Sequence, residues 1–322
     1  MNISPELLSA STIAVRDCMG VKPGEKVLVV TDEPVRTIGY ALWKAAKDLG
    51  SEVLLVEILP RKTNGEEPPA EVAELMKMFD VVLCPTSKSL THTDSRRNAA
   101  AAGARIATLP GMTEEIMVRC MNADYKKIAE RTFKICAMME KTAVIRVEAP
   151  AGTKVVLPIK GRTAHASSGL FREKGLWGNL PTGESYLAPL EGQSQGVVVV
   201  DGSMASVGMV RQPIRITVKD GYATDIEGGT EAKKLIELLE PHGKDGRNVA
   251  EFGMGTNDKA ILTGLIIEDE KVMGTIHIAF GDNKSMGGSV RAASHLDGLI
   301  KQPTVWFDDT LVMKQGKFTI PL

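Results

Sequence analysis

The chain has few cysteines and few aromatic residues. Its four cysteines, Cys18, Cys84, Cys120 and Cys136, lie far apart and form no Cys-x-x-Cys pair. That spacing disfavours a structural zinc knuckle or a disulfide framework, and it fits a reducing compartment. Aromatic residues make up 4% of the chain and the formal net charge is −1. Neither value favours a surface that stacks on bases or attracts polyanions, so we expect no nucleic-acid partner.

Long apolar runs and a targeting segment are lacking as well. No hydrophobic stretch approaches the roughly 20 residues that span a bilayer. Residues 1–6, MNISPE, contain neither the basic segment nor the apolar core of a signal peptide. We therefore expect a cytoplasmic protein with no membrane partner. At 322 residues, of which 43% are hydrophobic and 25% are charged, the chain is long enough for about two globular domains.

The first part of the chain alternates apolar runs with segments of helical periodicity, which is typical of a parallel sheet covered on both faces. The expected strands cover residues 26–30, 52–58, 81–84 and 105–109, and the expected helices cover residues 35–49, 70–78 and 95–102. An amphipathic helix over residues 123–141 is expected to close this domain. We predict a Rossmann-like α/β domain over residues 1–140.

The character of the sequence changes after residue 140. Short β-branched runs separated by glycine and proline turns predict strands over residues 144–147, 154–157, 196–200 and 214–218. One clear helix, over residues 230–239, interrupts them. We predict a β-rich α+β domain over residues 141–322, which gives a chain of the α/β class with two domains.

Three side chains suited to a divalent metal lie near the C-terminus. His277 is one of only five histidines, and His295 and Asp297 follow within about twenty residues. In a strand over residues 275–280, alternation places His277 beside two small residues while its apolar neighbours face a core. His295 and Asp297 project to the same side of an extended backbone. The alternatives are a hydrogen-bonded structural histidine, and an aspartate that orients a histidine from outside the metal's ligand set.

Two glutamates and a lysine complete the candidates. Glu251 lies in an expected strand over residues 248–255, where a carboxylate must be paired, exposed or metal-bound. Glu184 follows a turn over residues 177–183. Lys284 lies in the glycine-rich loop 281–288, which has no Walker spacing, and no GxGxxG follows the first strand, so we expect no nucleotide cofactor.

The order of these motifs resembles the thermophilic metallo-aminopeptidase family of the aminopeptidase T and aminopeptidase S type. The motifs are NLPTGE ending at Glu184, NVAEFG around Glu251, HIAFG from His277, and the HLD of His295 and Asp297. The resemblance covers most of the chain. It implies a metal-dependent hydrolase that removes N-terminal residues from small peptides, and a homodimer.

The same resemblance implies that Glu184, Glu251, His277, His295 and Asp297 hold two divalent ions, zinc, cobalt or manganese, at a cleft between the domains. Glu251 or Glu184 would bridge the ions or act as a general base. Lys284 falls at or near the position of a catalytic tyrosine in that family, and we predict a catalytic role for it beside Glu251.

Two other interpretations stay open. The chain is shorter than a typical aminopeptidase of this type, and it resembles the iron-dependent 2,5-dihydroxypyridine 5,6-dioxygenase, a short relative. That resemblance implies one Fe(II) ion on His277, His295 and Asp297, two imidazoles and one carboxylate that leave coordination positions open. The other interpretation is a non-catalytic relative that binds a small ligand between the domains.

Overall fold

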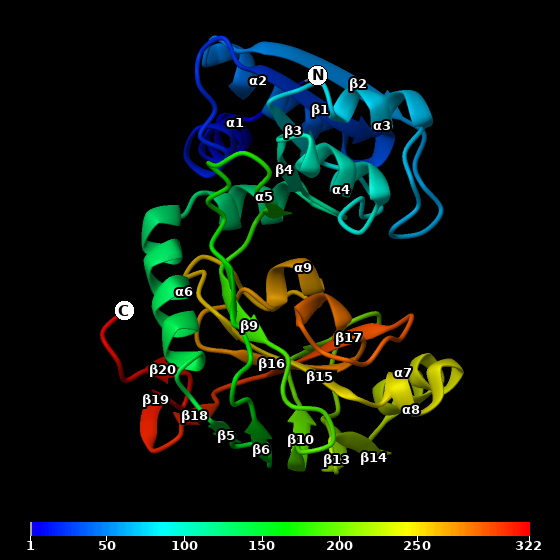
Figure 1. The fold of residues 1–322 in the computed structure, drawn as a ribbon, viewed down its shortest axis with the longest axis vertical. Helices are drawn as coiled ribbons and strands as arrows, with labels where there is room; N and C mark the ends of the chain where they lie inside the picture. The colour runs from blue at the N-terminus through cyan, green and yellow to red at the C-terminus, as the bar shows by residue number, and fades with distance from the viewer. Residues whose placement is uncertain (1) are drawn as a thin grey trace. The chain divides into compact units, whose positions relative to one another are not determined.

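Residues 2–322 are described by a computed structural model, whose helices and strands are labelled in Figure 1. Contacts within the chain group it into two units. Unit 1 contains the residues up to Lys127 together with Gly169–Thr182, and unit 2 contains Ile128–Ser168 and Gly183–Leu322. Unit 1 is thus discontinuous in sequence, and a single boundary near residue 140 stays a prediction.

Unit 1 is built on a five-stranded parallel sheet in the order β2-β1-β3-β4-β8. Its strands are β1 (Lys26–Asp32), β2 (Glu52–Ile58), β3 (Val81–Cys84), β4 (Arg105–Thr108) and β8 (Trp177–Asn179). The first four confirm the strands expected from apolar runs. β8 lies in a segment that we expected to be a turn, and it extends the sheet beside β4.

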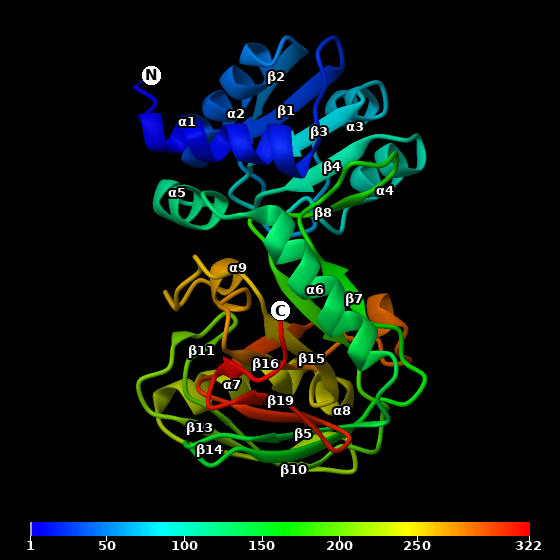
Figure 2. The ribbon, with the colours of Figure 1, turned by 90° about the vertical axis from the view of Figure 1, so that its left-hand side faces the viewer.

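Helices cover both faces of this sheet. They are α1 (Pro5–Thr12), α2 (Arg36–Asp48), α3 (Ala70–Met76), α4 (Asp94–Ala101) and α5 (Glu114–Met121). Because β1 has β2 on one side and β3 on the other, right-handed crossovers place α2 and α3 on opposite faces. Figure 2 shows α1 and α2 on one side of the sheet and α3 and α4 on the other. On the second face, Val72 and Met76 of α3 share a buried core with Val30 and Val82 of the strands.

Unit 2 contains two largely antiparallel sheets. The first has eight strands in the order β14-β13-β10-β6-β5-β18-β19-β20. These strands are β5 (Val144–Glu148), β6 (Lys154–Pro158), β10 (Gln195–Val200), β13 (Ile214–Lys219), β14 (Tyr222–Glu227), β18 (Thr304–Phe307), β19 (Thr310–Lys314) and β20 (Lys317–Phe318). The four strands that β-branched runs predict between residues 144 and 218 all belong to this sheet.

The second sheet has seven strands in the order β12-β11-β17-β16-β15-β9-β7. They are β7 (His165–Ser167), β9 (Glu184–Leu187), β11 (Ser203–Met204), β12 (Gly208–Met209), β15 (Val249–Gly255), β16 (Ile276–Gly281) and β17 (His295–Ile300). One face of this sheet packs on the first sheet around a shared core that includes Ile278, Phe280, Ile145 and Val147 (Figure 2). The other face is left for polar side chains.

Helices border these sheets. They are α6 (Tyr125–Met139), α7 (Thr230–Leu239), α8 (Gly243–Gly246) and α9 (Ile266–Asp269), with short 3₁₀ turns η3 (Glu240–His242) and η4 (Lys284–Met286). α7 confirms the helix expected at the same residues. The parallel sheet of unit 1 and the β-rich unit 2 confirm the predicted α/β class. No helix within residues 2–322 combines the length and the apolar character needed to cross a membrane.

Candidate metal centre

Four adjacent strands of the seven-stranded sheet carry all five residues that we predicted as metal ligands. In sheet order these strands are β9, β15, β16 and β17. They carry Glu184, Glu251, His277, and the pair His295 and Asp297, respectively. The structure therefore brings together residues spread over more than a hundred positions of the sequence.

The register of the strands explains why these side chains share one face. Ala279 of β16 pairs with Glu251 on one side and with Asp297 on the other, and His277 pairs with Gly253. Directly paired residues project to the same face, as do residues two apart on one strand. A β-bulge between Val249 and Glu251 interrupts the register beside the cluster, a feature that often occurs next to active sites.

Side chains alternate between the two faces along β16, which places its apolar residues in the core and His277 on the other face. Ile276, Ile278 and Phe280 are fully buried in the core between the sheets, as we predicted from the sequence. His277 is also fully buried, on the opposite face. Its neighbour Gly253 has no side chain, and a Cβ built there would lie 2.0 Å from Nε2 of His277. The imidazole therefore fits only because position 253 is glycine.

Glu251 connects the two imidazoles. Its Oε1 lies 3.1 Å from Nε2 of His277 and its Oε2 lies 3.1 Å from Nε2 of His295. Nε2 of His295 also lies 3.5 Å from Oδ1 of Asp297. Glu251 and Asp297 are 6% and 7% exposed. Two nitrogens and two carboxylates thus face one another in a largely dehydrated space.

Burial and ion pairing shift the pKa values of these groups in opposite directions. Burial opposes the charge of Glu251, but hydrogen bonds from both imidazoles outweigh it and hold the pKa of this carboxyl well below its usual value. Burial also opposes a charged His277, yet the bond to Glu251 raises its pKa to about 9. Asp297 and Glu251 likewise raise the pKa of His295 well above its usual value. The buried carboxylates thus favour positive charge on the imidazoles between them.

A backbone contact fixes the orientation of His295. Its Nδ1 lies 2.7 Å from the carbonyl oxygen of Asp282. This carbonyl can only accept, so Nδ1 carries the hydrogen, and Nε2 is left to face Glu251 and Asp297. A histidine that binds a metal is usually held in this way by a carbonyl or carboxylate on its other nitrogen.

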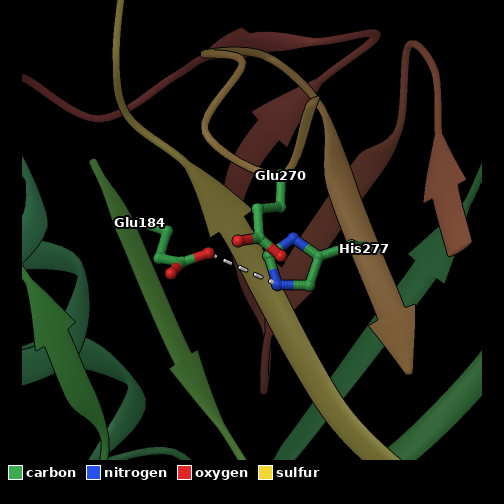
Figure 3. Close-up of side chains that lie close together, drawn as sticks. All are labelled: Glu184, Glu270 and His277. Atoms are coloured by element: carbon green, nitrogen blue, oxygen red, sulfur yellow. Dashed lines mark ion pairs between the residues drawn. The ribbon is translucent and has the colours of Figure 1, made fainter. Parts of the chain in front are cut away.

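A second group of possible ligands adjoins the first. Figure 3 shows Glu184 and Glu270 beside the imidazole of His277. Oε2 of Glu184 lies 3.7 Å from Nε2 of His277. This oxygen is buried and has no hydrogen-bond partner among the residues that the structure describes, which is costly for a carboxylate unless a cation is near.

Glu270 and Lys271 belong to the candidate site, and sequence reasoning missed both. Nζ of Lys271 lies 2.6 Å from Oε1 of Glu184 and also forms an ion pair with Glu270. Burial lowers the pKa of Lys271, but the two carboxylates outweigh it and raise it above its usual value. Burial, together with the charge of Glu184, raises the pKa of Glu270 to about 8 despite the nearby ammonium. The run Glu268-Asp269-Glu270-Lys271 is typical of a solvated surface, so its pattern carries no signal of a buried site.

Lys284 does not lie among these contacts. It is exposed in the 3₁₀ turn η4, and its backbone N–H donates to Asp282 at 3.2 Å. Its predicted catalytic role is untested by this geometry and stays a prediction.

The residues present fit a divalent transition metal. Two groups within residues 2–322 can each bring three ligand atoms to within 4.8 Å of one another, namely Glu251, His295 and Asp297, and Glu184, Glu270 and His277. Mixed imidazole and carboxylate donors suit iron, zinc, cobalt or manganese. The buried Glu184 oxygen without a hydrogen-bond partner and the oriented His295 add to this fit.

Two solved structures share this fold over nearly the whole chain, and a known relative is similar in sequence over most of it. The 2,5-dihydroxypyridine 5,6-dioxygenase of Pseudomonas putida is 22% identical over 245 residues, which is 72% of this chain and 69% of that protein. A solved structure of 2,5-dihydroxypyridine dioxygenase from the same species superposes with a TM-score of 0.85 at 20% identity, covering 99% of both chains. Wild-type AmpT from Thermus thermophilus gives 0.72 at 17% identity, covering 98% of this chain and 99% of its own.

These comparisons correct the predicted activity. AmpT supports a link in fold to aminopeptidase T, but the expected peptide hydrolase is wrong because the family match is to a dioxygenase. A dioxygenase family implies a bound metal ion. Fe(II) is the metal that the alternative interpretation of the sequence implies. The NicX family model, 2,5-dihydroxypyridine 5,6-dioxygenase, matches residues 7–320. The chain belongs to the 2,5-dihydroxypyridine 5,6-dioxygenase family.

Proposed function

We propose that this protein is a ring-cleaving dioxygenase that uses one Fe(II) ion to open a dihydroxylated pyridine ring. The observation that carries the proposal is the cluster of Glu251, His295 and Asp297 beside His277. It supplies two imidazoles and carboxylates in a chain that the dioxygenase family model matches almost from end to end. One ion replaces the two zinc, cobalt or manganese ions that the aminopeptidase resemblance implied.

The ion would be held by His295, Asp297 and Glu251, whose ligand atoms lie within 4.8 Å of one another. His277 is the second imidazole available to it, because its Nε2 reaches the same Glu251 carboxylate at 3.1 Å. A set of two histidines and a carboxylate is common among non-haem Fe(II) oxygenases. When bound, the ion supplies the redox chemistry by which dioxygen attacks an aromatic ring.

The protein's own part is to orient the ligands and to leave one side of them accessible. The His295 side chain is 31% exposed, whereas those of Glu251 and His277 are 8% and 0% exposed. A substrate ring would therefore approach beside His295, while the buried side excludes water from the carboxylates. The carbonyl of Asp282 keeps the accessible imidazole in place during that approach.

The test is oxygen uptake by the iron-loaded protein. Protein reconstituted with Fe(II) under argon is mixed with 2,5-dihydroxypyridine and air-saturated buffer in an oxygen electrode. We expect consumption of one O2 for each molecule of substrate lost, and no consumption by protein loaded with Zn²⁺. Protein that holds iron and stays folded but consumes no oxygen with this substrate would contradict the proposal. A homodimer stays a prediction, which sedimentation analysis can check.

A further inference from the structure

Lys271 occupies the centre of the second group of carboxylates. It is 2% exposed, its Nζ is 2.6 Å from Oε1 of Glu184, and it also pairs with Glu270. Both carboxylates belong to the group that could hold an ion together with His277. The ammonium therefore lies against two of the three ligands that a second metal would need.

We propose that the ammonium of Lys271 takes the place of a second metal ion, so that this site holds one divalent ion where five or six ligands would otherwise accept two. The inference rests on the metal-binding part of the proposed function. The ion would bind Glu251, His295 and Asp297, with His277 beside them, and Lys271 would pair with Glu184 and Glu270.

Charge supports this assignment. Glu184 is buried and Glu270 is half-buried. Without a cation beside them, the two carboxylates would repel each other and lose much of their hydration. The ammonium provides the charge and directs donors at both carboxylates. A divalent ion in the same group would lie within a few ångströms of a fixed positive charge, in surroundings where water and salt screen the repulsion poorly. The second ion is thus disfavoured while Lys271 stays in place.

The backbone around Lys271 keeps it in place. Its N–H donates to the carbonyl of Glu268 at 2.9 Å, and its own carbonyl accepts from the N–H of Asn257 at 2.9 Å. The next residue packs against the end of β15, because a Cβ at Gly255 would lie 2.2 Å from the carbonyl oxygen of Val272. A main chain held on both sides leaves the side chain little freedom to swing out of the group.

The acidic residues before Lys271 hold the turn that presents it. Glu268 accepts from the N–H of Ile261 at 2.9 Å, and Asp269 accepts from the N–H of Thr263 at 2.7 Å. Both carboxyl side chains are fully buried. These contacts are made within the loop rather than with the metal ligands, so the loop can form before any ion binds.

The first test is the number of ions that the whole protein binds. Wild-type protein is titrated with Zn²⁺, which undergoes no redox change, and the bound metal is measured by elemental analysis after gel filtration. We expect saturation at one ion per chain. Two ions per chain would overturn this inference and leave a metal-dependent function intact. No bound ion would overturn both.

The second test changes the lysine itself. Lys271→Ala removes the ammonium and opens space beside Glu184, and we expect it to bind two Zn²⁺ per chain. Lys271→Arg keeps a positive charge in the group and should stay at one. A folded Lys271→Ala variant that still binds one ion would overturn the inference.

A matched pair of carboxylate substitutions keeps the inference testable if Lys271→Ala does not fold. Glu251→Gln alters a residue assigned to the ion and should weaken Zn²⁺ binding by about tenfold or more. Glu270→Gln alters a residue assigned to Lys271 and should change the affinity by less than about threefold. An equal loss of affinity in both variants would overturn the assignment.

Discussion

Gly253 lies directly opposite His277 in the antiparallel pair of β15 and β16, and the imidazole fills the space that a side chain at position 253 would need. A Cβ there would lie 2.0 Å from Nε2 and 2.2 Å from Cε1 of the ring. Gly253 does not have the left-handed backbone that favours glycine elsewhere in the chain. Its role is therefore to provide space for the imidazole.

Gly253→Ala should displace His277 from Glu251. We expect overpacking to lower the free energy of unfolding by about 1–3 kcal/mol and to weaken metal binding by about tenfold, measured by denaturant unfolding and by metal titration. Gly229→Ala is the control, because its added methyl group meets the flexible end of Gln212. The control should change stability by less than about 1 kcal/mol. Normal metal affinity in Gly253→Ala would count against the packing argument.

His295→Ala should weaken metal binding strongly while the fold persists. The imidazole is partly exposed and supplies Nε2 to the cluster with Glu251 and Asp297. Removal of a residue that only orients a metal ligand typically lowers metal affinity by about 10- to 100-fold. Loss of a ligand should cost at least as much, so we expect the affinity for Fe(II) to fall by about 100-fold or more. His242→Ala removes a half-buried histidine from η3 and should keep full metal content. Elemental analysis of both variants, with circular dichroism to check folding, decides the matter; unchanged iron in His295→Ala would remove this residue from the ligand set.

Metal binding should also raise the free energy of unfolding of the protein. Any ligand that binds the folded state alone raises the free energy of unfolding, by about 2.7 kcal/mol when its free concentration is 100 times Kd. Fe(II) added under argon should therefore shift the denaturation midpoint of the wild-type protein upward. The same addition to His295→Ala should leave the midpoint unchanged. A shift of equal size in that variant would place the ion elsewhere.

Unit 1 offers a prediction that is independent of the metal. Asp32, at the end of β1, is buried, and its Oδ2 accepts from the N–H of Ser87 at 2.8 Å and from its hydroxyl at 2.6 Å. Asp32→Ala should lower the free energy of unfolding by about 2 kcal/mol, since hydrogen bonds to a charged acceptor are lost. Asp48→Ala breaks an exposed ion pair with Lys44 and should cost less than about 1 kcal/mol. Equal losses of unfolding free energy in the two variants, measured by urea denaturation, would show that the buried hydrogen bonds of Asp32 add no stability.

Local patterns were sufficient to predict much of the fold and the strand faces that carry His277, His295 and Asp297. The face of β16 that carries His277, and the common side of His295 and Asp297, follow from alternation along a strand. The helix Thr230–Leu239 follows from its amphipathic period, and it forms at those residues. These features depend on residues only a few positions apart, so they can be predicted from a single sequence.

Long-range contacts could not be predicted in this way. β8 exists because Trp177–Asn179 pairs with β4, about seventy residues earlier, and its own residues resemble a turn. Lys271 is buried because Glu184 lies 87 positions before it, although its charged neighbours indicate a solvent-exposed surface. The reaction class could not be derived from the ligands either, because the same imidazoles and carboxylates serve hydrolases and oxygenases.

Isotope labelling of the product tests the central claim most directly. Iron-loaded protein is allowed to react with 2,5-dihydroxypyridine under ¹⁸O2, and the ring-opened product is analysed by mass spectrometry. A dioxygenase places both atoms of one O2 molecule in the product, so we predict a mass increase of two ¹⁸O atoms and no label in the His295→Ala reaction. A ring-opened product that carries oxygen from water alone, or unchanged substrate with fully iron-loaded protein, would contradict the account.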